Sequence, residues 1–164
     1  SNLNADLLDG LHADEINKVT TLSTIYASAP NIGSTATTVH SYTMPENVLS
    51  TNGQRLEIVF TGMSADNTNA KNIEAYFGGT SIATFSNNES GSTNRWYIKL
   101  IFVRTGTSKA IVSFDGTWNK GYGGGYGISV SGLNFTTTNK IEIQLMSSVS
   151  YNVTAQLSTI THFK

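Results

Sequence analysis

Residues 115–127 hold the densest group of side chains in the chain that could contact a ligand. The segment reads DGTWNKGYGGGYG, so aromatic, amide, carboxylate and ammonium groups alternate with glycines. Aromatic rings stack on the C–H faces of sugars, and Trp and Tyr offer a large contact area at a low cost in side-chain entropy. Glycine allows the backbone to approach a ligand closely. We therefore expect a loop that binds a receptor, with these contact residues: Asp115, Trp118, Asn119, Lys120 and Tyr122.

A structural interpretation of the same segment stays open. The glycines could form the edge of a sheet, with Tyr126 directed to the core, because Tyr126 has the same parity as Ile128 and Val130. Trp118 would then close one end of the domain. The residue types alone do not decide between a binding loop and a sheet edge.

Catalytic chemistry has little support in the sequence. Glycoside hydrolysis needs two carboxylates that flank a cleft, and the acidic residues are scattered along the chain. Asp115 is the only acid beside the expected ligand loop. A Gly-x-Ser-x-Gly nucleophile motif does not occur. We expect a protein that is not an enzyme.

Metal and cofactor sites also have little support. The three histidines, His12, His40 and His162, are far apart in the sequence and form no His-x-His pair. Residues 66–69 resemble the start of a calcium loop, but they lack the remaining ligands and the closing acid. We expect neither a bound metal nor a cofactor.

Composition restricts the class of protein. The 164 residues correspond to one globular unit. A net charge of -1 gives no basic face for nucleic acid, and no apolar run is long enough to cross a bilayer. Cysteine is absent, which excludes disulfides and thiolate chemistry.

The elements that would position these residues are predicted to be strands. Residues 56–60 and 141–145 alternate between apolar and other side chains, which is typical of a half-buried strand. Residues 73–77 and 81–85 flank Gly78-Gly79-Thr80 and predict a hairpin. The chain contains eight to ten such segments, so we expect an antiparallel β-sandwich or barrel with almost no helix after residue 18. A change of parity at Gly132 predicts a β-bulge.

The chain divides into residues 1–18, a connector with at most one or two helical turns, and residues 19–164, the β domain. Within the domain, residues 96–103 are apolar on both faces of the predicted strand, except at Lys99. Only one face of a sandwich strand meets the core, so another surface must cover the second face. We expect a neighbouring subunit to cover it, and the alternatives are a long loop over the strand or a few exposed aromatic side chains.

Residues 3–16, LNADLLDGLHADEI, closely resemble a short element that recurs in bacteriophage tail fibres just before a new fibre domain. Residues 55–58, Gly62 and residues 69–80 more weakly resemble a jelly-roll head domain of such fibres. These heads tend to be trimeric and are distantly similar in shape to tumour-necrosis-factor-like jelly rolls. The resemblance implies a jelly-roll-like, trimeric head that acts outside the cell as part of the virion.

The resemblance further implies host attachment. The partner would be a bacterial surface glycan or an outer-membrane protein, bound without insertion into the membrane. Two alternatives stay open: a structural knob that drives trimerisation without touching the host, and a tail-spike depolymerase. A depolymerase would need clustered acids and a long repetitive β-helix, and neither pattern is found in the sequence.

Overall fold

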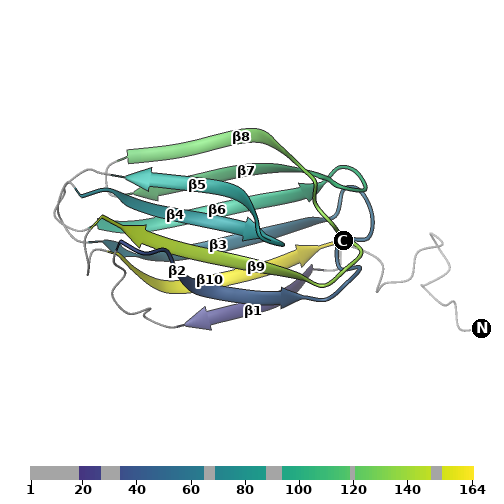
Figure 1. Ribbon diagram of the computed structural model, residues 1–164, viewed down its shortest axis with the longest axis horizontal. Helices are drawn as coiled ribbons and strands as arrows, with labels where there is room; N and C mark the ends of the chain where they lie inside the picture. The colour runs from purple at the N-terminus through teal and green to yellow at the C-terminus, as the bar shows by residue number, and fades with distance from the viewer. Residues whose placement is uncertain (1–18, 27–33, 65–68, 88–93, 119–120, 149–152) are drawn as a thin grey trace, which may run out of the picture.

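The fold was described from a computed structural model, which describes residues 19–26, 34–64, 69–87, 94–118, 121–148 and 153–164 (Figure 1). The described residues form ten strands and no helix. The prediction of an all-β protein is therefore confirmed. The expected connector, residues 1–18, lies outside the described residues. The strands are β1 (Val19–Tyr26), β2 (Thr37–Met44), β3 (Arg55–Ser64), β4 (Lys71–Phe77), β5 (Thr80–Asn87), β6 (Asn94–Arg104), β7 (Lys109–Trp118), β8 (Gly121–Ser131), β9 (Asn139–Ser147) and β10 (Val153–Phe163).

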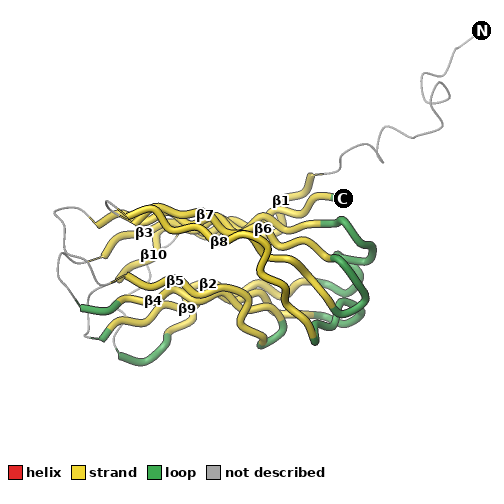
Figure 2. Tube along the Cα trace, turned by 90° about the horizontal axis from the view of Figure 1, so that it is seen from above, coloured by secondary structure: helices red, strands yellow, loops and turns green. Residues whose placement is uncertain are grey.

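The strands form two antiparallel sheets that pack face to face (Figure 2). The larger sheet has the strand order β1-β10-β3-β6-β7-β8, and the smaller sheet has the order β2-β9-β4-β5. The chain crosses repeatedly between the two layers, which gives a jelly-roll-like sandwich. The expected fold class, an antiparallel β-sandwich, is thus observed.

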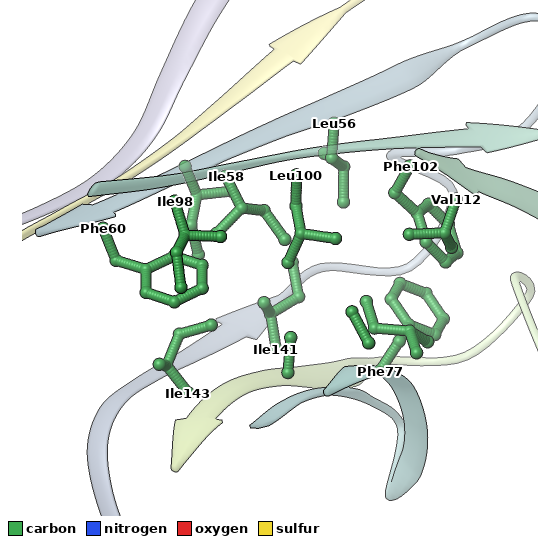
Figure 3. Close-up of a cluster of buried hydrophobic side chains, with 14 of the residues drawn as sticks. Leu56, Ile58, Phe60, Phe77, Ile98, Leu100, Phe102, Val112, Ile141 and Ile143 are labelled. Carbon is green, nitrogen blue, oxygen red and sulfur yellow. The ribbon is translucent and has the colours of Figure 1, made fainter. Parts of the chain in front are cut away.

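Alternation along each strand creates the core. In β3, Leu56, Ile58 and Phe60 are buried, and the residues between them face the other side of the sheet. Figure 3 shows side chains of both sheets meeting between the layers. Phe77 of the smaller sheet stacks on Phe102 of the larger sheet, with 4.9 Å between the ring centroids. Burial of these apolar side chains is the main stabilising contribution to the fold.

The predicted β4–β5 hairpin is confirmed. Phe77 pairs with Thr80, and the two residues between them, Gly78 and Gly79, have φ values of 57° and 81°. A two-residue turn with positive φ at both positions matches the twist of the flanking strands, and glycine adopts it without steric cost.

The predicted bulge at Gly132 is wrong. Strand β8 ends at Ser131, and Gly132 has a φ of 77°, so the chain leaves the sheet at this position. The parity changes because Leu133 and Phe135, both buried, belong to the connection after the strand. The register between β7 and β8 shifts elsewhere, between Val112 and Phe114.

Candidate functional site

The glycine-rich segment 115–127 is a β-hairpin rather than a loop. Residues 115–118 are the last part of β7, and residues 121–127 are the first part of β8. The register pairs Asp115 with Gly124 and Thr117 with Tyr122. The expectation of a loop is wrong, because backbone pairing with β7 offsets the weak strand preference of glycine. The alternative interpretation, a glycine-rich sheet edge, agrees with the position of β8 at the edge of its sheet.

The five predicted contact residues have different positions in this hairpin. Asp115 is exposed on β7. Tyr122 lies on β8 opposite the exposed Thr117, and Trp118 lies opposite Trp96 of β6. Asn119 and Lys120 lie outside the described residues. The hairpin therefore brings the backbones of Asp115 and Tyr122 onto neighbouring strands.

The outer face of the larger sheet supplies two neighbours that the sequence analysis did not select. Lys99 of β6 is the register partner of Asp115, and its Nζ lies 2.9 Å from Oε2 of Glu57. Tyr97, which is 40% exposed, is the register partner of Thr117. Tyr97 faces the outer side of the sheet because side chains alternate along a strand, and its neighbours Trp96 and Ile98 are buried in the core. An aromatic ring, hydroxyl groups and both charges thus occur together on this outer face.

One glycine of the segment is required by packing rather than by a ligand. A Cβ atom on Gly116 would lie 3.0 Å from the carbonyl oxygen of Tyr97 and 3.2 Å from Cγ1 of Ile98. Gly116 is buried against β6, so it leaves room for its neighbours on that strand. Packing against β6 therefore explains Gly116 without a ligand.

The fold also brings together carboxylates that are distant in the sequence. Glu74 of β4 pairs with Gln144 of β9, and the neighbouring Tyr76 pairs with Glu142. The Tyr76 hydroxyl donates a hydrogen bond to Oε2 of Glu74. This hydrogen bond, followed by partial burial and by the charge of Glu74, raises the pKa of Tyr76. Two carboxylates, an amide and a phenol therefore lie together on the smaller sheet, and only the register could reveal this.

The two histidines of the described residues lie in the interior of the domain. His40 of β2 and His162 of β10 are buried, and Nε2 of His40 lies 3.2 Å from the hydroxyl oxygen of Ser23 in β1. Burial lowers the pKa of both imidazoles, and the charge of Lys164 lowers that of His162 further. Within the described part of the chain, no three side chains of His, Asp or Glu form a group that could hold a metal ion.

Comparisons with known proteins give distant structural likenesses only. No family model and no curated protein matches the chain. One similar structure is the CBM36-1 domain of a multidomain xylanase from the hindgut metagenome of Trinervitermes trinervoides, with 12% identity and a TM-score of 0.35 over 89% of this chain and 95% of that one. Another is the CBM2 module of the evolved Dit of Lactobacillus casei BL23 phage J-1, with 10% identity and a TM-score of 0.39 over 88% and 96%.

A third similar structure is the VP2 subviral particle of infectious bursal disease virus, with 12% identity and a TM-score of 0.32 over 91% of this chain and 41% of that one. Identities and TM-scores of this size are too low to transfer a ligand or an assembly to this chain. The described residues also contain no helix that is long and apolar enough to cross a membrane.

Proposed function

We propose that this chain is the receptor-binding domain of a bacteriophage tail fibre, which attaches the virion to a bacterial surface glycan or outer-membrane protein. Support comes from the resemblance of residues 3–16 to tail-fibre connectors and from the β7–β8 hairpin. The proposed contact residues are Asp115, Trp118, Asn119, Lys120 and Tyr122.

The single observation that carries this proposal is the exposed position of Asp115 beside a strand of glycines. Its register partner on β8 is Gly124, and Gly123 and Gly125 are the next residues on either side. Gly124 has no side chain, so the residue that pairs with Asp115 leaves the carboxylate uncovered. A hydroxyl-rich ligand can therefore reach both the carboxylate and the backbone of the edge strand.

The topology places the end of the hairpin far from the start of β1. β1 begins at Val19, opposite Phe163 near the end of β10, so both strand ends lie at one end of the sandwich (Figure 1). Trp118 and Gly121 form the last pair of the hairpin at the other end of the larger sheet. A fibre segment that joins the domain before Val19 would therefore leave this end free to meet a receptor.

We propose that the domain works as a homotrimer. One shallow contact of this kind binds weakly, whereas several linked copies bind with much higher avidity. The structural-knob alternative would also use a trimer, but it predicts no binding of the domain to cells. The domain acts without catalysis in this proposal.

The test is the binding of the fluorescently labelled chain to a panel of bacteria. Selective binding to some strains is expected, and periodate or protease treatment of the cells separates a glycan receptor from a protein receptor. Absence of binding to every strain on which a phage with this fibre grows would contradict the proposal and support the knob.

The depolymerase alternative has its own test. The chain is incubated with purified surface polysaccharide of a bound strain, and new reducing ends are measured. We expect none. Release of reducing ends by the wild type but not by Glu74→Gln would establish hydrolysis at the carboxylates of the smaller sheet.

A further inference from the structure

Tyr97 is an exposed aromatic side chain in the middle of the larger sheet. Its strand, β6, pairs with β3 on one side and with β7 on the other. The register partners of Tyr97 are Thr61 and Thr117, whose side chains are short and carry hydroxyl groups. A ring that is 40% exposed between two threonines can be contacted from the solvent side.

The core holds the backbone beneath Tyr97 in place. Trp96 and Ile98, its neighbours along β6, are buried, and the Trp96 ring packs edge-on against Phe60 with 5.9 Å between the ring centroids. Gly116 of β7 packs closely on the same strand, because a Cβ atom there would lie 3.0 Å from the carbonyl oxygen of Tyr97. A side chain on a well-packed strand needs little ordering when a ligand binds, so the ring is preorganised for contact.

Arg95 supplies a cation on the same face of β6, two residues before Tyr97. Both residues are exposed, whereas Trp96 between them is buried, as expected from the alternation of side chains along a strand. The guanidinium group is planar and binds carboxylate or phosphate oxygens through two parallel hydrogen bonds. An aromatic ring and a group that recognises anions therefore lie side by side in the sequence of one face.

The three arginines of the chain differ in their contacts. The Arg55 guanidinium lies 4.3 Å from the centroid of the Phe163 ring, and Nε of Arg104 donates a hydrogen bond to the carbonyl oxygen of Gly106. Arg95 forms no ion pair, ring contact or hydrogen bond with any residue that the structure describes. Its guanidinium is thus available to an anionic group of a ligand.

The two sides of Tyr97 along the sheet have different charges. On one side lie the register partners Lys99 and Asp115, and Nζ of Lys99 is 2.9 Å from Oε2 of Glu57. Arg95 lies on the other side, toward the end of the hairpin. A sugar stacked on the ring can therefore direct an anionic group to Arg95 and hydroxyl groups to Asp115, because a carboxylate accepts hydrogen bonds from hydroxyls.

We propose that Tyr97 and Arg95 form a subsite for a sugar that carries an anionic group, either a carboxylate or a phosphate. This inference rests on the proposed function and specifies the ligand class of its receptor site, an acidic surface glycan. The subsite is continuous with the proposed contact, since the row of Tyr97 and Thr117 continues to Tyr122 on β8. The hydroxyl and charged groups around the ring favour a polyhydroxylated ligand over a protein, because the centres of protein interfaces are depleted of charge.

The test measures binding of the labelled chain to purified surface polysaccharide from a strain that the wild type binds. Tyr97→Thr removes the ring but keeps a residue that favours strands, and we expect it to weaken each site about 2- to 30-fold. Arg95→Gln should weaken binding at least about threefold and reduce its dependence on salt. The controls are Tyr97→Phe, which keeps the ring, and Lys140→Gln, which removes an exposed cation of the smaller sheet. Both should bind like the wild type.

Two treatments of the polysaccharide identify the anionic group. Reduction with carbodiimide and borohydride converts carboxylates to alcohols, and aqueous hydrogen fluoride removes phosphate esters. We expect the wild type to bind one of the two products as weakly as Arg95→Gln binds the untreated polysaccharide.

Circular dichroism melting shows whether the variants are folded, and Tyr97→Leu replaces Tyr97→Thr if the latter does not fold. Normal binding by both the Tyr97 and the Arg95 variants would overturn this inference and leave the proposed function intact. Unchanged binding after both treatments, or cell binding that is lost after protease but not after periodate, would also overturn it. Loss of binding in the Tyr97 variant alone would contradict the anionic ligand class. Absence of binding to every strain on which a phage with this fibre grows would contradict the proposed function, and this inference with it.

Discussion

At the scale of single residues, Tyr122 gives a direct test of the receptor contact. A stacked aromatic contact contributes about 0.5–2 kcal/mol, so Tyr122→Ala should weaken each site by roughly 2- to 30-fold. The melting temperature should not change if the Tyr122 side chain contacts the receptor rather than the core. The matched control is Tyr76→Ala on the smaller sheet. Normal cell binding by Tyr122→Ala together with a loss in Tyr76→Ala would move the site to the smaller sheet.

Trp118 needs a separate comparison, because its register partner, Trp96, is buried. If Trp118 contacts the receptor, Trp118→Ala abolishes cell binding and melts like the wild type. A melting temperature lower by many degrees, with unchanged binding per folded protein, assigns Trp118 to the core.

Gly62 shows how one missing side chain permits the packing of a large one. A Cβ atom at this position would lie 2.0 Å from the carbonyl oxygen of Thr154 and 2.2 Å from Cζ2 of Trp96. We expect Gly62→Ala to lower the free energy of unfolding by about 1–3 kcal/mol, as in other overpacked cores. Gly106→Ala is the control, since its Cβ would make only an ordinary 3.5 Å contact with Lys109. Equal urea midpoints for the two variants would contradict this account.

At the scale of the element, β6 separates the core from the outer surface within a few residues. Ile98 is buried, so an aspartate there places an unpaired charge in the core, which costs about 3–5 kcal/mol. Ile101 is half-buried on the outer side, so Ile101→Asp should fold and only weaken self-association. Solubility and circular dichroism measure folding, and light scattering measures mass. An Ile101→Asp protein as unstable as Ile98→Asp would show that both sides of the strand belong to a core.

At the scale of the whole molecule, the buried histidines make stability depend on pH. Burial lowers the pKa of His40 and His162 in the folded state, whereas the unfolded chain binds protons at about pH 6.5. The unfolded state therefore binds more protons below that pH, and the free energy of unfolding falls as the pH decreases. We expect a constant contribution from both groups above about pH 7 and a declining melting temperature toward pH 5.

His40→Gln should reduce this decline, because the variant has one titrating group fewer in the core. The measurement is the difference in melting temperature between the wild type and His40→Gln at several pH values. The contribution of the carboxylates cancels in this difference, because they titrate equally in both proteins. A melting temperature of the wild type that rises on acidification would contradict the assignment of neutral, buried imidazoles.

The sequence by itself determined the strands and one hairpin. Alternation in residues 56–60 and 141–145 is a local pattern, and the tight turn at Gly78 and Gly79 is set by the freedom of glycine at positive φ. The apolar second face of residues 96–103 was also evident without a structure. Each of these features depends on residues that are close together in the sequence, so the sequence is enough to predict it.

Only the tertiary structure decided how distant residues meet. The segment 115–127 became a hairpin because β7, held by β6, offers backbone partners to a glycine-rich strand that has little strand preference of its own. Glu74 and Glu142 share a face because β4 pairs with β9 across a long stretch of sequence. Which side of β6 faces the core also follows from the second sheet. Pairing register and sheet packing are long-range properties, and residue order alone does not encode them in a readable pattern.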